Sequence, residues 1–190
     1  MMTNPELLRS NLVEFVLRLK SMGVKNISSF ETLTEPDKQT LSRALENLYF
    51  LEIIDNKTNL TDLGKKVCDL PIDPKLAVAL FQAGETKFKC SEEVLYIVSM
   101  LSIPNLFHQP NDPSNLLKAK QNLGVIEGDH LTLLNIFKQY RYCKTGKSKF
   151  CKDLYLHENN MKQVEEMVHN LKLYLKKYNI KIISSLDTDG

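Results

Sequence analysis

The chain has 190 residues, enough to bury a hydrophobic core without disulfides or metals and to form one large domain or two small ones. Its formal net charge of +2 is close to neutral, so the total charge favours no class of partner, and the distribution of charge along the chain matters more.

The cysteines are spaced in a way that argues against disulfides and zinc. There are four of them, and none forms a Cys-x-x-Cys pair: Cys68, Cys90, Cys143 and Cys151. No signal peptide precedes them, which is typical of reduced thiols in a cytosolic or nuclear protein. Cys143, Cys151 and His157 also lack the paired spacing of zinc ligands, so the sequence predicts no metal site.

Two amphipathic helices are predicted first. One runs from about Asn4 to Met22 and ends at Gly23, which suits a left-handed exit. The other covers about residues 37–51. The predicted buried stripe of the first helix is Leu8, Leu12, Phe15, Leu19 and Met22, and that of the second is Leu41, Ala44, Leu45 and Leu48.

Residues 52–70 predict a hairpin and a short closing helix. Two short extended pieces flank the turn Asn56-Lys57-Thr58, and Thr61 can cap a helix that ends near Asp69. Two helices, a hairpin and a closing helix are the plan of a winged-helix domain, here over residues 1–70.

In a winged-helix domain that binds DNA, the helix before the wing is often the one that contacts the DNA. Over residues 37–51, Lys38 and Arg43 are balanced by Asp37 and Glu46. Because phosphate and base readout normally needs a surplus of Arg and Lys, this pattern favours a packing and partner-docking role. Duplex-DNA binding remains the alternative with less support.

The most apolar stretch predicts the central helix of a bundle, Ser91–Ser102. Ser91 can cap it, Glu92 and Glu93 suit its first turn, and Pro104 stops it. Since the helix is apolar nearly all round, other elements must enclose it. It is too short to cross a membrane, which takes about 20 apolar residues.

Further helices are predicted around this central one, over residues 71–178. Pro71–Pro74 is a rigid joint in which Asp73 caps the next helix. One later helix starts at Asp112 and carries Lys118 and Lys120. Three more helices follow, over His130–Cys143, Phe150–Leu156 and Asn160–Tyr178, and Asp129 caps the first of them. The apolar side of the first is Leu131, Leu134, Ile136, Phe137 and Tyr140. The last has a heptad-like seam of Met161, Val164, Val168, Leu171, Leu175 and Tyr178. Residues 179–190 read as a strand that begins another domain, or as a tail.

A basic run is the candidate nucleic-acid site. Between positions 138 and 152 there are six cations and no acidic residue: Lys138, Arg141, Lys144, Lys147, Lys149 and Lys152. Tyr140, Tyr142 and Phe150 are interleaved with them. Clustered cations with aromatic rings suit single-stranded RNA, whereas the plainer alternative is a solvated lysine-rich loop.

The sequence offers no catalytic or nucleotide site. Thr145-Gly-Lys-Ser148 resembles the end of a phosphate-binding loop, but Arg141 stands where that loop needs glycine. Asp129-His130 could pass for a catalytic pair, yet helix capping explains Asp129 more simply. We therefore predict no catalytic residue and no bound cofactor in this chain.

Three stretches resemble the C-terminal region of DEAH-box RNA helicases. They are Leu60-Thr-Asp-Leu-Gly-Lys-Lys-Val-Cys-Asp-Leu-Pro-Ile-Asp-Pro-Lys-Leu-Ala77, Cys90-Ser-Glu-Glu through Met100-Leu-Ser-Ile-Pro-Asn105, and Glu127-Gly-Asp-His-Leu-Thr-Leu-Leu-Asn135. The opening Asn4-Pro-Glu-Leu-Leu-Arg-Ser-Asn-Leu12 is similar to the point where that family leaves its second ATPase domain.

The resemblance implies a mainly α fold: a winged-helix domain with a small β-hairpin, a helical ratchet bundle over residues 71–178, and the start of an OB-fold. It implies an accessory part of an ATP-dependent RNA helicase in the nucleus, or alternatively the cytoplasm, serving splicing or ribosome biogenesis. ATP and Mg²⁺ would bind in upstream ATPase domains. Expected partners are single-stranded RNA, those ATPase domains, the OB-fold and a glycine-rich-patch (G-patch) activator docked on the winged helix, but no membrane.

Overall fold

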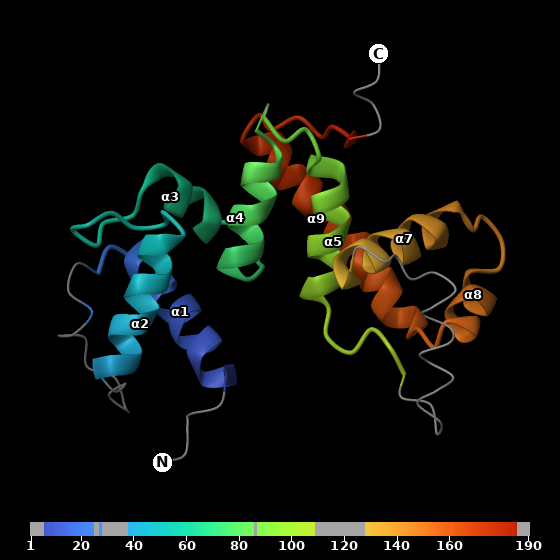
Figure 1. Cartoon of the computed structure of the whole chain (residues 1–190), viewed down its shortest axis with the longest axis horizontal. Coiled ribbons are helices and arrows are strands. Elements are labelled where there is room, and N and C mark those ends of the chain that lie inside the picture. The colour runs from blue at the N-terminus through green and yellow to red at the C-terminus, as the bar shows by residue number, and fades with distance from the viewer. Residues whose placement is uncertain (1–5, 25–26, 28–37, 86, 109–127, 186–190) are drawn as a thin grey trace. The chain divides into compact units, whose positions relative to one another are not determined.

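The computed structural model describes residues 6–24, 27, 38–85, 87–108 and 128–185, with side chains from residue 12 onward. The chain divides into two compact units, Met1–Val78 and Ala79–Gly190. Figure 1 labels the helices of both units. Among the described residues, no helix has the length and apolar character needed to cross a membrane.

The described residues of the N-terminal unit form three helices and the start of a fourth. They are α1 (Glu6–Ser21), α2 (Lys38–Phe50), α3 (Asp62–Cys68) and α4 (Pro74–Ala83), which runs on into the second unit. Helices α1 and α2 pack side by side, and α3 lies against α1. The predicted face of α2 is confirmed, because Ala44 and Leu48 are buried while Leu41 and Leu45 are half-buried.

The buried stripe predicted for α1 is partly wrong. Val16, Leu17 and Leu19 are buried, but Phe15 is 37% exposed and Met22 is 72% exposed. The reason is that α1 contacts both α2 and α3, so its buried arc is centred on Val16 rather than on Phe15. Met22 lies beyond the last helical turn. The side chain of Leu8 lies outside the described residues.

Gly23 ends α1 in the left-handed conformation that the sequence predicts. Its φ is +87°, and two hydrogen bonds close the helix end: Val24 N donates to Leu19 O at 3.1 Å, and Gly23 N donates to Lys20 O at 3.0 Å. This pair of bonds defines a Schellman motif, which satisfies carbonyl groups that the helix itself leaves free.

The predicted wing is present as a tight turn with a single antiparallel bridge between Ile54 and Leu60. Asp55 organises this turn, since its Oδ1 accepts hydrogen bonds from the backbone N of Lys57 and of Asn59, both at 2.8 Å. The bonds from Asn59, foremost among the causes, lower the pKa of Asp55. On the side facing α1, Lys20 Nζ donates to Thr58 Oγ1 at 3.1 Å.

The wing leads directly into α3 through a cap and a glycine. Gly64 N donates to Thr61 Oγ1 at 2.9 Å, so the predicted cap is confirmed. A Cβ on Gly64 would lie 2.1 Å from the carbonyl oxygen of Ile53, which means that only glycine allows α3 to approach the wing this closely. The cap of α4 is also confirmed, because Lys75 N donates to Asp73 Oδ1 at 2.8 Å.

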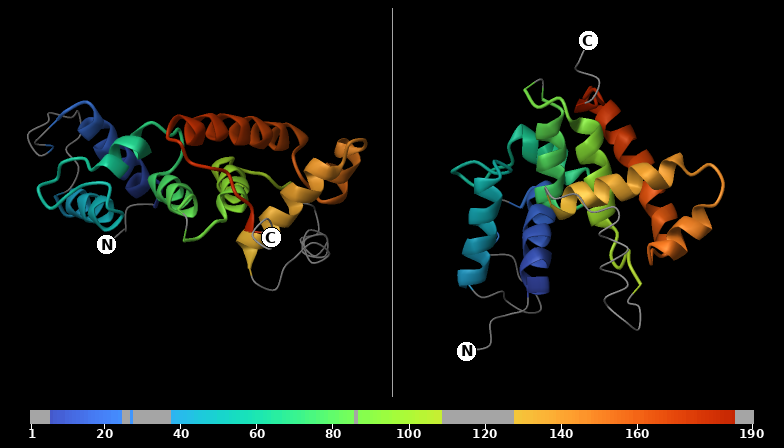
Figure 2. Two further views of the ribbon diagram at one scale, coloured as in Figure 1. Left: turned by 90° about the horizontal axis from the view of Figure 1, so that it is seen from above. Right: turned by 45° about the vertical axis from the view of Figure 1, so that its right-hand side comes forward.

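The C-terminal unit is a bundle around α5 (Ser91–Ser102), whose predicted bounds are confirmed. Helix α5 packs on α7 (Asp129–Tyr142) and on α9 (Glu158–Lys177), and α8 (Lys147–Asp153) packs on α9 (Figure 2). Most of α5 is enclosed, although Leu101 is 39% exposed. The α9 seam is confirmed, because its members from Met161 to Leu175 are buried.

Two helix starts in this unit differ from the prediction. Ser91 is the first helical residue of α5 and not its cap, and Cys90 at the cap position makes no side-chain bond to the helix. Asp129 is likewise the first residue of α7, after Gly128 with φ +129°. Because Leu131 comes so early in α7, it is 39% exposed, whereas Leu134 and Phe137 are buried. Helix α8 begins three residues earlier than predicted.

The segment after α9 folds back onto α5. Asn179 has φ +56°, Ile180 N donates to Leu175 O at 2.9 Å, and the chain then returns in extended form (Figure 2). Glu92 N donates to the carbonyl oxygen of Ile183 at 3.1 Å, so this return segment, residues 180–185, supplies the cap that Ser91 was expected to supply. The domain boundaries at 70/71 and 178/179, and the OB-fold at the end, stay predictions.

Candidate nucleic-acid interface

The six cations of the basic run lie on the C-terminal half of α7, on the turn after it and on α8. The turn is possible because Gly146 adopts φ +92° before α8 starts. The structure divides the six into an inner trio, Lys138, Arg141 and Lys147, and an outer trio, Lys144, Lys149 and Lys152. Lys118 and Lys120, which we also predicted to bind RNA, lie outside the described residues.

The inner lysines are paired with acidic residues from other helices. Lys138 Nζ lies 3.5 Å from Glu93 Oε1 on α5, and Lys147 Nζ lies 2.6 Å from Glu165 Oε1 on α9. Lys147 Nζ also lies 4.4 Å from the centre of the Tyr140 ring. These pairs neutralise charge that the sequence alone shows as unopposed.

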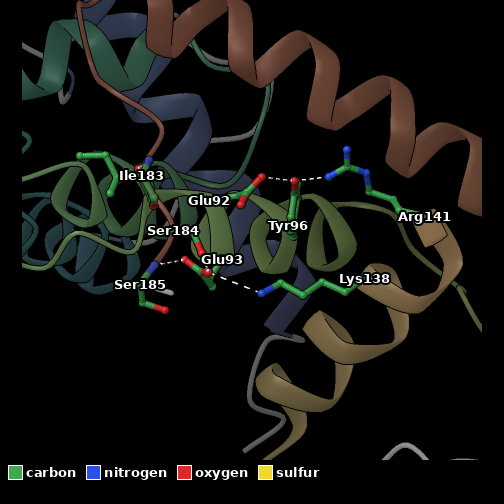
Figure 3. Close-up of polar contacts among 9 residues, drawn as sticks. Glu92, Glu93, Tyr96, Lys138, Arg141, Ile183, Ser184 and Ser185 are labelled. Atoms are coloured by element: carbon green, nitrogen blue, oxygen red, sulfur yellow. Dashed lines mark hydrogen bonds and ion pairs between the residues drawn. The ribbon is translucent and has the colours of Figure 1, made fainter. Parts of the chain in front are cut away.

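Arg141 is held by Tyr96, as Figure 3 shows. The Arg141 guanidinium donates to the Tyr96 hydroxyl and lies 5.1 Å from the centre of that ring, and the hydroxyl donates to Glu92. Burial raises the pKa of the Tyr96 phenol, and the hydrogen bond to Glu92 adds to this effect. The phenol therefore stays protonated and links α5 to α7 through a chain of three polar groups.

Glu93 is a buried carboxylate that is bonded by three other residues (Figure 3). It is 8% exposed and accepts hydrogen bonds from Ser184 Oγ at 2.5 Å and from Ser185 N at 3.2 Å, in addition to its pair with Lys138. Burial alone would raise the pKa of Glu93, but these bonds outweigh it and leave the pKa below its ordinary value. Glu93 thus joins α5, α7 and the return segment.

The outer trio is exposed, although Lys152 contributes, after Lys162 and Ser148, to lowering the pKa of Glu158. Lys144, Lys149 and Lys152 are exposed, and within the described part of the chain no carboxylate lies within ion-pair distance of their amino groups. One exposed ring accompanies them, since Tyr142 is 82% exposed. The other two rings serve packing, because Tyr140 is fully buried and Phe150 is half-buried beside it, with ring centres 6.2 Å apart.

The groups considered for chemistry are not gathered into a site. Asp129 and His130 are both exposed in the first turn of α7, and Thr145–Ser148 covers the end of the turn before α8 and the first two residues of that seven-residue helix. In the residues that the structure describes, no three His, Cys, Asp or Glu side chains are placed to hold a metal ion.

A second exposed surface lies on the N-terminal unit, at the end of α2. Tyr49 is 50% exposed and Phe50 is 78% exposed, with their rings 6.1 Å apart. They border a pocket of about 540 Å³ that Ile54 and Leu63 also line. Large apolar groups around a hollow are typical of protein docking rather than of phosphate binding.

Comparison with known proteins gives a consistent result over nearly the whole chain. Residues 44–72 match the family model of the helicase associated domain (HA2), winged-helix, and residues 73–133 match that of the helicase associated domain (HA2), ratchet-like. The chain is 33% identical over 181 residues to the pre-mRNA-splicing factor ATP-dependent RNA helicase prp22 of Schizosaccharomyces pombe, covering 95% of this chain and 15% of that protein. It is 36% identical over 186 residues to the probable ATP-dependent RNA helicase DHX35 of Homo sapiens, covering 96% of this chain and 26% of that protein.

Proposed function

The chain belongs to the helicase-associated (HA2) family found in the C-terminal region of DEAH-box RNA helicases, and on that basis we propose that it lines the RNA path of such a motor. In this role it couples the motion of the ATPase domains to stepwise movement along RNA. The observation that carries the proposal is the match to both HA2 domains, in order, together with two RNA helicases that are similar over nearly the whole chain.

The outer trio supplies the contact with RNA. Lys144, Lys149 and Lys152 neutralise phosphates, and Tyr142 offers a ring on which a base can stack. The inner trio holds the surface in place, because its cations are already bonded to Glu93, Tyr96 and Glu165. Such a surface grips the backbone and not particular bases.

The hydrolysis of ATP and the binding of Mg²⁺ belong, in this proposal, to ATPase domains joined to this region. The chain spans 15% and 26% of the lengths of the two relatives, which is compatible with ATPase domains elsewhere in such a protein. One of the relatives is by name a pre-mRNA-splicing factor, which supports the proposal of a nuclear location, with the cytoplasm as the alternative.

The test uses a variant of the outer trio with a matched control. We expect the triple variant Lys144→Glu/Lys149→Glu/Lys152→Glu to bind a fluorescent oligouridine at least about tenfold more weakly, with a salt slope smaller by roughly 2 because phosphate contacts are lost. The control is Lys172→Glu/Lys176→Glu/Lys181→Glu, which reverses three lysines of the same unit on another surface. Equal losses in both variants would show that only total charge matters and would contradict the assignment of this surface.

Coupling is tested in a helicase that contains this chain together with ATPase domains. The outer-trio variant should unwind less RNA per ATP hydrolysed, while hydrolysis in the absence of RNA stays unchanged. An unchanged ratio of unwinding to hydrolysis would refute the coupling role.

A second function is favoured by the exposed rings of the N-terminal unit. Tyr49 and Phe50 beside their pocket offer a docking surface for a G-patch activator. Calorimetry with a G-patch peptide should give saturable heat with the full chain and a much weaker signal with Phe50→Ser. Because Phe50 is 78% exposed, this change leaves the core intact. Equal heat with both proteins would exclude this surface.

A further inference from the structure

The C-terminal unit carries an apolar groove that is bordered by lysines. It has a volume of about 620 Å³ and lies between the C-terminal half of α9 and the return segment. Its walls are mostly apolar, formed by Leu173, Ile180 and Ile182, and three lysines surround them, Lys172, Lys176 and Lys181. Leu173 is 56% exposed and Ile182 is 38% exposed, so aliphatic surface faces solvent here.

The return segment forms one side of the groove, and hydrogen bonds hold this segment at both of its ends. At one end, the left-handed Asn179 turns the chain back, and Asn179 N donates to Lys176 O at 3.0 Å. There Ile180 also packs on Gly84, where a Cβ would lie 2.3 Å from the Ile180 Cγ2 atom. At the other end, Ser91 Oγ donates to Lys181 O and accepts from Ile183 N, each at 2.9 Å.

The lysines of the groove are not paired with acidic residues among those that the structure describes. In the part of the chain that the structure describes, no carboxylate lies within 4.0 Å of the amino group of Lys172, Lys176 or Lys181. Lys172 is also near a ring, 6.0 Å from the centre of Tyr96. None of the residues that line the groove is acidic. The groove therefore combines an aliphatic floor with an uncompensated positive rim.

This combination suits a peptide better than RNA. Single-stranded RNA is held by cations together with aromatic rings on which bases stack, whereas the apolar lining of this groove is aliphatic and His169 supplies the one ring among its described lining residues. An amphipathic peptide matches both parts, because apolar side chains at helical spacing fill an apolar groove and flanking acidic residues meet the rim.

We propose that this groove docks an acidic, amphipathic segment of a partner protein, whose leucine-like side chains contact Leu173, Ile180 and Ile182 and whose carboxylates pair with Lys172, Lys176 and Lys181. This interface is separate from the RNA surface of the outer trio and does not depend on it.

The test uses three probes with the full chain. The first is a fluorescent helical peptide with leucines at positions i, i+3, i+4 and i+7 and glutamates elsewhere. The second is the same peptide with lysines in place of the glutamates, and the third is oligouridine. We expect saturable binding of the acidic peptide that weakens with salt and is at least about tenfold tighter than that of its lysine counterpart.

The site is located with variants and methyl NMR. The rim variant Lys172→Glu/Lys176→Glu/Lys181→Glu should weaken the acidic peptide at least about tenfold, whereas the outer-trio variant should leave it unchanged. In the unmodified chain, the methyl signals of Leu173 and Ile182 should shift on titration. Leu173→Ser, at an exposed position, serves as a second variant if the charge reversals lower stability.

Three results would overturn the proposal. They are the absence of saturable binding of the acidic peptide at millimolar concentration, equal weakening by both lysine variants, and methyl shifts that lie elsewhere in the chain. Oligouridine that displaces the acidic peptide and loses affinity in the rim variant would assign the groove to nucleic acid instead.

Discussion

The starts of α3 and α4 and the start of α5 are secured over very different distances along the chain. In the N-terminal unit, Thr61 bonds Gly64 and Asp73 bonds Lys75, two or three positions away. In the C-terminal unit, the first turn of α5 is bonded by residues 181–185, about ninety positions away. The starts of α3 and α4 are therefore capped by residues next to them in the sequence, whereas the start of α5 depends on a segment from the other end of its unit.

The largest expected effect comes from removing the carboxylate of Glu93, which joins α5 to α7 and to the return segment. Glu93→Ala leaves Lys138 and Ser184 without their buried partner, and we expect the free energy of unfolding of the C-terminal unit to fall by about 3 kcal/mol. Urea unfolding and hydrogen exchange of α5 measure this loss. The control is Asp62→Ala, a local surface pair with Lys65, which should leave the urea midpoint unchanged. Equal effects of the two variants would contradict the comparison.

The next effect tests close packing within the N-terminal unit. Gly64→Ala places a Cβ against the Ile53 carbonyl oxygen, and we expect a loss of about 2 kcal/mol in unfolding free energy. Gly23→Ala is the matched control, because that position has open space and only a positive φ, so the expected loss is about 1 kcal/mol. Urea unfolding compares the two. A smaller loss for Gly64→Ala than for Gly23→Ala would be inconsistent with the tight approach of α3 to the wing.

A smaller effect separates local from distant capping. Thr61→Ala and Ser91→Ala each remove one side-chain hydroxyl, and each should cost about 1 kcal/mol. Hydrogen exchange distinguishes them: Thr61→Ala should speed exchange within α3 and the adjoining wing, whereas Ser91→Ala should speed it in both α5 and residues 181–185. Faster exchange confined to α5 in Ser91→Ala would mean that the return segment is held without Ser91.

The smallest effect is the contribution of Glu93 to the pH dependence of stability. Because the folded state holds the pKa of Glu93 below its ordinary value of 4.5, its contribution is complete above that pH and is lost as the pH falls through the lower, folded value. Glu93→Gln should therefore show a shallower loss of stability on acidification than the unmodified chain. Parallel curves from urea unfolding at several pH values would count against this.

The sequence predicts much of the fold because many of its signals act over short distances. The bounds of α5, the cap of α3, the turn at Gly23 and the seam of α9 all depend on residues within a few positions, and all are confirmed. The expected caps Ser91 and Asp129 are wrong, since a backbone carbonyl far along the chain replaces the first. The family resemblance is confirmed by both HA2 matches.

The candidate site also depends on contacts between residues that are far apart in the sequence. The run from Lys138 to Lys152 contains no acidic residue, yet the fold sets Glu93 and Glu165 against two of its lysines. The residues of the run do not predict these two partners, because Glu93 lies on α5 and Glu165 lies on α9. The rim lysines of the groove were missed for a similar reason, since Lys181 joins Lys172 and Lys176 only after the chain reverses at Asn179.

The link between Tyr96 and Arg141 also gives the protein a built-in optical reporter. The chain has seven tyrosines and no tryptophan, so its near-ultraviolet absorbance is dominated by phenol groups. Burial raises the pKa of Tyr96 and of Tyr140, so these two phenols should ionise last in an alkaline titration. Since burial is the main cause in both cases, ionisation at a lower pH would report, without any attached label, that the core around these two rings has opened to water.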